Sequence, residues 1–151
     1  MGHFKAGEGE AFWKAFQDAM GYDDKEMEYC MNSARAKWAP KMAGSDIQDS
    51  TLVIEVIESH GCANGMKVGD KLYFQGCGLL DTKRSDNWCA SAFNHVSKVS
   101  NVCHNLILHG IDPNDMYNDC QSCSDCGTKY GWGNVIMRSS IIKEPKDKKE
   151  K

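Results

Sequence analysis

The chain has no apolar run close to the roughly 20 residues that a membrane-spanning helix needs. Its first eight residues, MGHFKAGE, also lack the hydrophobic segment of a secretion signal. Lys and Arg number 18 against 21 Asp and Glu, so there is no excess of positive charge for nucleic acid or anionic lipid. We therefore expect a cytoplasmic protein that binds neither membranes nor nucleic acid.

The sequence also lacks the short motifs of common catalytic sites. It contains no nucleophile elbow and no HExxH pair. The spacing of Gly61, Gly65 and Gly69 resembles a phosphate loop only loosely, because the Lys-Ser/Thr of a P-loop is missing. Turn geometry is the better explanation of these glycines.

Apolar periodicity predicts helices in the first third of the chain. From about residue 8 to 22 an apolar side chain recurs every fourth position, at Phe12, Phe16 and Met20. A second helix is predicted from Asp23 to Trp38, with Glu26 placed to complete a capping box. These two helices form a predicted N-terminal extension over residues 1–45.

The pattern in the middle of the chain predicts strands and one long helix. The β-branched run 51–57 is the clearest strand, and 71–74 follows it at a distance that suits an antiparallel pair. A helix is expected from about 86 to 108, with Phe93 on its apolar face, and a last strand over 134–138. The fold class is therefore predicted as α+β.

With 151 residues, 41% of them apolar, the chain has room for one domain with a real core. We expect residues 46–142 to form that domain, a small antiparallel sheet packed with one or two helices. The segment 143–151 has five Lys against three Asp or Glu and no apolar residue. It is predicted to be a disordered, charged tail.

The most specific chemical feature is a run of three evenly spaced cysteines, Cys120, Cys123 and Cys126, among eight in all. In a reducing compartment cysteines serve as free thiols, metal ligands or reactive groups. Three closely spaced thiolates with a remote fourth are typical of a 4Fe–4S cluster, whereas zinc more often uses two separated pairs. The spacing favours a cluster, with zinc or no metal at all as the alternatives.

The fourth ligand is less certain from sequence, because several residues could supply it: Cys62, Cys77, Cys89 and Cys103, with His60, His95 and His104 as nitrogen alternatives. In one continuous helix the Cα atoms of Cys89 and Cys103 would lie about 21 Å apart, at roughly 1.5 Å per residue. They cannot both ligate the same centre. Proximity in sequence favours Cys103, so the predicted metal site is Cys120, Cys123, Cys126 and Cys103.

The core from 53 to 137 also carries a set of short motifs: Cys62-Ala63-Asn64-Gly65, Gly69-Asp70, Cys89-Ala90-Ser91-Ala92 and the cysteines from Cys120 onward. In these motifs the chain resembles a small, largely uncharacterised family of bacterial and archaeal cysteine-containing domains. The resemblance implies an accessory protein of anaerobic metabolism. It also implies that Cys62 and Cys89 belong together, as a thiol pair or site apart from the cysteine triple.

Two functions follow as hypotheses. The first is a metal- or iron–sulfur-binding accessory subunit of a larger enzyme, which docks through the Phe, Trp and Met side chains of the N-terminal helices. The second is a small free-standing enzyme that uses the thiol of Cys62 or Cys89 in a pocket beside the loop from Gly65 to Asp70.

Overall fold

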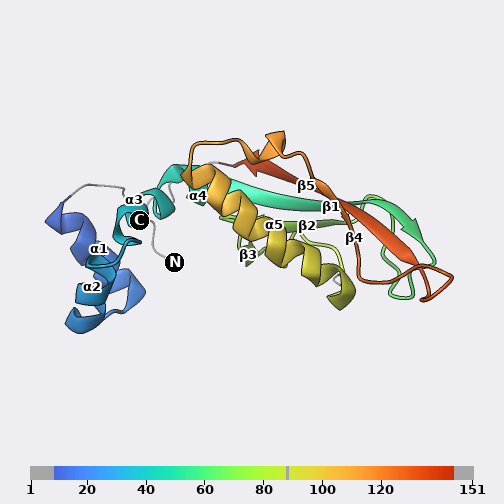
Figure 1. Cartoon of the computed structure of the whole chain (residues 1–151), viewed down its shortest axis with the longest axis horizontal. Coiled ribbons are helices and arrows are strands. Elements are labelled where there is room, and N and C mark those ends of the chain that lie inside the picture. Colours follow the sequence, from blue (N-terminus) through green and yellow to red (C-terminus); the bar gives the residue numbers. More distant parts are fainter. Residues whose placement is uncertain (1–8, 88, 145–151) are drawn as a thin grey trace.

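The computed structural model describes residues 9–87 and 89–144, and it consists of a five-stranded antiparallel sheet, one long helix and a set of short helices. The helices are α1 (Glu10–Met20), α2 (Asp24–Met31), α3 (Ala39–Met42), α4 (Ser45–Gln48) and α5 (Ala90–Leu108), with 3-10 turns η1 (Ala36–Trp38) and η2 (Pro113–Asp115). Figure 1 shows α5 lying along one face of the sheet, with α1 and α2 beyond its end. The predicted α+β class is confirmed.

The first three strands follow one another as a meander, and the chain returns to the other edge of the sheet only after the long helix. Its strands are β1 (Ser50–His60), β2 (Lys71–Gln75), β3 (Leu79–Leu80), β4 (Cys120–Ser122) and β5 (Asn134–Lys143), in the spatial order β3-β2-β1-β5-β4. The predicted antiparallel pair is β1 with β2, in which Val53 faces Tyr73. None of the helices in the described ranges is both long and apolar enough to cross a bilayer.

The core lies between α5 and the sheet. Alternate residues of β1 point toward α5, because successive side chains of a strand face opposite sides. The fully buried side chains on this face include Leu52, Ile54 and Met137. Each such aliphatic side chain stabilises the fold by about 1.5–3 kcal/mol.

On the helix side, the stripe that meets the sheet is Ala92, Val96, Val99 and Cys103. The prediction that Phe93 faces the core was wrong, because its side chain is 54% exposed. Phe93 is next to Ala92 in sequence, so it lies about 100° away around the helix, outside the stripe.

The N-terminal segment confirms one local prediction and corrects another. Asp23 and Glu26 form the predicted capping box, each side chain accepting the other's backbone N–H. The second helix ends at Met31 rather than Trp38, because Ser33 donates its hydroxyl to the Cys30 carbonyl and turns the chain. Serine competes with helical hydrogen bonding in this way.

Residues 43–50, where the N-terminal extension meets the domain, hold α4 and the first residue of β1. A small separate cluster joins α1 to α3, in which Phe12 packs with Ala39 and Ala43. The predicted tail of 143–151 falls mainly outside the described residues, and Lys143 is the last residue of β5.

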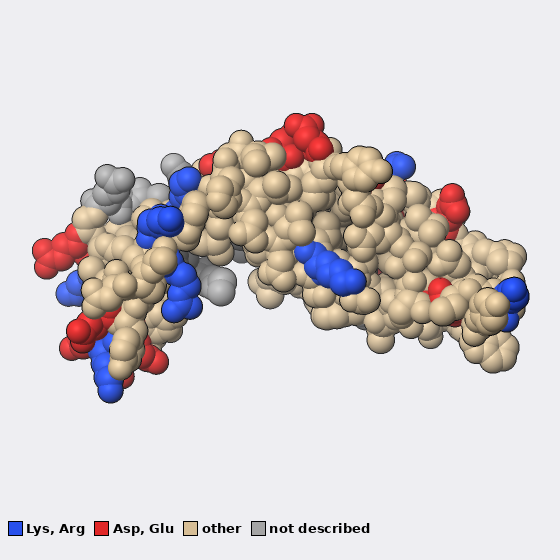
Figure 2. All heavy atoms as spheres, in the orientation of Figure 1, with Lys and Arg blue, Asp and Glu red and all other residues tan. Residues whose placement is uncertain are grey.

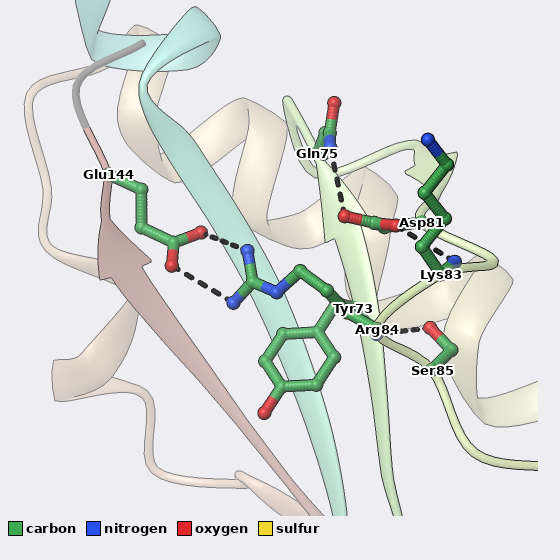
Figure 3. A network of polar contacts seen from close by, with 7 residues as sticks. All are labelled: Tyr73, Gln75, Asp81, Lys83, Arg84, Ser85 and Glu144. Atoms are coloured by element: carbon green, nitrogen blue, oxygen red, sulfur yellow. Dashed lines mark hydrogen bonds and ion pairs between the residues drawn. The ribbon is translucent and has the colours of Figure 1, made fainter. Parts of the chain in front are cut away.

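The sheet face opposite α5 carries a network of polar contacts (Figure 3). Arg84, in the segment between β3 and α5, forms a two-pronged ion pair with Glu144 at 2.8 and 2.9 Å. Its guanidinium also lies over the ring of Tyr73, 4.2 Å from the centroid. The segment is held along the edge of β2 by the Ser85 hydroxyl, which accepts the Tyr73 N–H. Arg84 therefore ties this segment to the end of β5.

The Arg84–Glu144 pair is about 40% exposed, so solvent screening limits its energy. In a double-mutant cycle with Arg84→Ala and Glu144→Ala, we expect a coupling energy of about 0.5–1 kcal/mol, as for exposed pairs of good geometry. Urea unfolding of the four proteins measures it. A coupling that is unchanged in 1 M salt would contradict the assignment of an exposed ion pair.

Candidate functional site: a thiol cluster at the start of α5

Two loops cross at the end of the sheet, beside the start of α5. Gly61 follows β1, and Gly133 precedes β5. A Cβ at Gly61 would stand 2.7 Å from the carbonyl oxygen of Trp132, and one at Gly133 would collide with the His60 carbonyl. The two backbones can approach this closely only because both residues are glycine.

The β4–β5 loop is tied to the first turn of α5. The carbonyl oxygen of Ser91 accepts hydrogen bonds from both the N–H and the hydroxyl of Ser124, at 3.1 and 3.2 Å. Within the loop, the Asp125 carboxylate accepts the backbone N–H groups of Trp132 and Gly133. The loop is therefore internally braced and anchored to the helix.

Cys89 caps the start of α5. It is the N-cap residue, with its carbonyl oxygen accepting the Ala92 N–H at 2.9 Å, and its side chain is 6% exposed. The amide of Asn64 donates a hydrogen bond to its sulfur, with Nδ2 and Sγ 3.1 Å apart. The sulfur of this buried residue therefore has a polar hydrogen-bond donor directed at it.

Cys62 belongs to the same turn as Asn64. The Gly65 N–H donates to the Cys62 carbonyl at 3.1 Å, which closes the turn over Cys89. Cys62 is partly buried and packs against the core cluster that contains Cys89. The next residue, Met66, is 6% exposed and anchors the loop in that core.

The structure thus places Cys62 and Cys89 in or against the same core cluster, and the pairing implied by the resemblance stays a prediction. The loop glycines 61, 65 and 69 all have positive φ, which confirms turn geometry as their role. Asp70 closes the same loop by accepting the Lys67 N–H on its carboxylate.

The three evenly spaced cysteines point in different directions. Cys120 pairs with Arg138 across β4 and β5, on the sheet face away from α5. Cys123 packs against the core on the α5 side. Cys126 is exposed at the loop tip, its sulfur 3.9 Å from the Ser124 carbonyl oxygen. Residues three apart in an extended chain face opposite sides, which accounts for the separation of Cys120 from Cys123.

Cys120 has a charged neighbour instead. Its side chain is the main cause that raises the pKa of Arg138 above its ordinary value, and the Asp119 carboxylate adds to it. Arg138 Nε lies 3.4 Å from that carboxylate. Sequence reasoning missed this contact, because a cross-strand pair depends on the register of β4 against β5.

Cys103 lies elsewhere, fully buried in the second half of α5. Ser91, where the cysteine loop touches α5, is twelve residues earlier, which is about 18 Å along the helix at roughly 1.5 Å per residue. The neighbour of Cys103 is Cys77, a buried residue at φ 59 in the β2–β3 turn. The structure therefore does not bring Cys103 to the loop.

Taken over residues 9–87 and 89–144, no group of three His, Cys, Asp or Glu side chains is placed to hold a metal ion. The four-cysteine site stays a prediction. Of the nitrogen alternatives, His104 donates a hydrogen bond from Nε2 to the Gly76 carbonyl oxygen at 2.7 Å, in the Cys77 turn. His60 ends β1 at the loop crossing.

His95 is a buried histidine on the sheet side of α5, 3% exposed. Neither ring nitrogen has a hydrogen-bond partner of normal geometry among the described residues. Burial is the main cause that lowers its pKa, and the neighbouring Gln121 amide acts against it. Burial therefore favours the neutral imidazole.

Comparison with known proteins gave no matching family model, no matching curated protein and no matching solved structure. The resemblance drawn from the short cysteine motifs accordingly stays a prediction, and the site has to be interpreted from its own chemistry.

Two of the buried thiols, those of Cys77 and Cys103, are expected to resist ionisation. Burial is the main cause that raises the pKa of Cys77 to about 12, with Cys103 contributing, and burial raises that of Cys103 to about 11. The ordinary value is 9.0, so unfolded thiols ionise first as the pH rises. Their contribution to stability is complete below pH 9 and lost between about 9 and 11–12.

We therefore expect the free energy of unfolding to fall above pH 9, with a shallower slope in Cys103→Ala. The control Cys126→Ala removes an exposed thiol and should keep the wild-type slope. Urea unfolding between pH 8 and 10.5 measures both. Equal slopes in the wild type and Cys103→Ala would contradict the burial of an un-ionised Cys103 thiol.

Proposed function

We propose that the chain is a small cytoplasmic enzyme that uses the thiols of Cys62 and Cys89 at the start of α5. The observation that carries this proposal is the hydrogen bond from the Asn64 amide to the Cys89 sulfur. Through this bond a polar N–H group contacts the sulfur, whereas a cysteine that only fills the core behaves as a small apolar residue.

Several features support a site of this kind rather than packing alone. Cys62, partly exposed, lies in the turn that covers the buried Cys89, so a reagent meets one thiol before the other. The turn is fixed at both ends, by the loop crossing at Gly61 and by the buried Met66. Reactive thiols need such defined, partly accessible surroundings.

The competing proposal is a metal- or cluster-binding accessory subunit. What supports it is the density of thiols on the β4–β5 loop, where Cys126 is exposed and Cys123 partly so. A 4Fe–4S cluster or zinc would need the side chains of Cys120 and Cys123 on the same side of β4. It would also need a fourth ligand nearer than Cys103.

Metal analysis separates the two proposals. We expect protein purified without oxygen to contain less than about 0.1 Fe or Zn per chain, and iodoacetamide to label Cys62 while Cys77 and Cys103 stay unlabelled because they are buried and protonated. Elemental analysis and peptide mass spectrometry measure these results. About four Fe per chain, or about one Zn per chain, would contradict the thiol enzyme and support the accessory subunit.

Docking through the N-terminal helices belongs to the accessory-subunit proposal. Helices α1 and α2 border an open hollow of about 940 Å³, whose lining includes Trp13, Met27 and Met31. Met20 and Met31 are 44% and 50% exposed. Figure 2 shows charged side chains crowded over these helices, whereas the visible face of the sheet and α5 is mostly uncharged. Methionines with a charged rim suit a protein interface.

If a partner docks here, Met31→Glu should release it, because a charge in an apolar contact is costly to bury. We expect the tagged chain from its native cells to elute as a larger complex and the variant as a monomer. Leu79→Glu, which changes another exposed apolar residue, on β3, is the control and should keep the complex. A wild-type chain that elutes as a monomer would contradict docking.

A further inference from the structure

Cys62 and Cys89 differ in access to solvent, although the turn that carries Cys62 contacts Cys89 through Asn64. Cys62 is partly exposed, and Cys89 is 6% exposed beneath the turn. Both are free thiols. Asn64, two residues after Cys62, reaches the Cys89 sulfur at 3.1 Å, so the turn that carries Cys62 lies against Cys89.

The turn that carries Cys62 is held at the Gly61 crossing and can adjust at Gly65. Gly65 has a φ of 72°, and a Cβ there would meet no atom within 4 Å. Glycines adopt new backbone angles at low cost. The buried helix start, by contrast, holds Cys89 in place.

We propose that Cys62 and Cys89 form a dithiol–disulfide couple that reduces a low-molecular-weight disulfide, with Cys62 as the attacking thiol and Cys89 as the resolving thiol. This inference rests on the proposed thiol function and gives it a reaction class and a substrate class. A small disulfide suits the site because Cys62 is only partly exposed.

The chemistry takes two exchange steps. The Cys62 thiol loses its proton to solvent, its sulfur attacks one sulfur of the substrate R–S–S–R, and RS⁻ leaves and is protonated. The Cys89 sulfur then attacks the Cys62 sulfur of the mixed disulfide and expels the second RS⁻. The dithiol has lost two electrons and two protons, the substrate has become two thiols, and Cys62 is bonded to Cys89.

Asn64 acts as a positioning residue in the second step. Its N–H group holds the Cys89 sulfur toward the turn that carries Cys62 and so orients it for attack. Without it, the second step should slow by about 10-fold, the equivalent of one hydrogen bond. The first step should be unaffected, because it occurs at Cys62. A purely structural role would not separate the two rates.

The test exposes the reduced full-length protein to oxidised glutathione, quenches samples with N-ethylmaleimide, and maps each cysteine by peptide mass spectrometry. We expect a Cys62–Cys89 disulfide in the wild type. Cys89→Ser should instead accumulate glutathione on Cys62, and Cys62→Ser should leave Cys89 reduced. In Asn64→Ala, glutathione on Cys62 should persist about 10-fold longer than in the wild type, as expected for a lost hydrogen bond.

The control is Cys126→Ser, which removes an exposed thiol and should leave the Cys62–Cys89 disulfide unchanged. A wild-type protein that keeps glutathione on Cys62 while Cys89 stays reduced would overturn the couple, although thiol reactivity at Cys62 would stand. A disulfide between Cys123 and Cys126 in its place would also overturn it. If Cys62 did not react at all, the couple and the thiol function would fail together.

Discussion

The crossing of two backbones at Gly61 and Gly133 is the constraint on which the thiol end of the molecule depends. It brings the loop after β1 against the loop before β5, at a separation that leaves no room for a side chain. Since Ser124 in the second loop is hydrogen-bonded to Ser91 in α5, the crossing also fixes both loops relative to the start of the helix. Cys62, Cys89 and Cys123 are held around that point.

The alternation of side chains along the strands then determines on which face of the sheet the other cysteines lie. Because β4 pairs with β5, Cys120 lies beside Arg138 on the face away from α5, while Cys123 returns to the core side. The long helix separates the two ends of the core, so Cys103 packs with Cys77 far from the loop. Three cysteines that are evenly spaced in the sequence thus have three different surroundings in the fold, because the first of them lies in a strand.

Much of the fold could be predicted from the sequence, because apolar periodicity reports directly on strands such as β1 and helices such as α5. The capping box of Asp23 and Glu26 was predictable for the same local reason. The early end of α2 comes from the hydrogen bond of the Ser33 hydroxyl to the Cys30 carbonyl, and the exposure of Phe93 depends on which stripe of α5 meets the sheet. Apolar periodicity contains neither. For the site, short motifs indicated Cys62 and Cys89, but Asn64 carried no signal, since only the folded turn places its amide on a sulfur 25 residues away.

The central claim is that Asn64 and Cys89 interact directly and so join the turn to the helix start. A double-mutant cycle on the free energy of unfolding, with Asn64→Ala and Cys89→Ala singly and together, tests it most directly. The structure predicts a coupling energy of about 0.5–1.5 kcal/mol, the usual range for one intramolecular hydrogen bond. Additive effects, with a coupling below about 0.3 kcal/mol, would contradict it, because side chains without shared contacts behave independently.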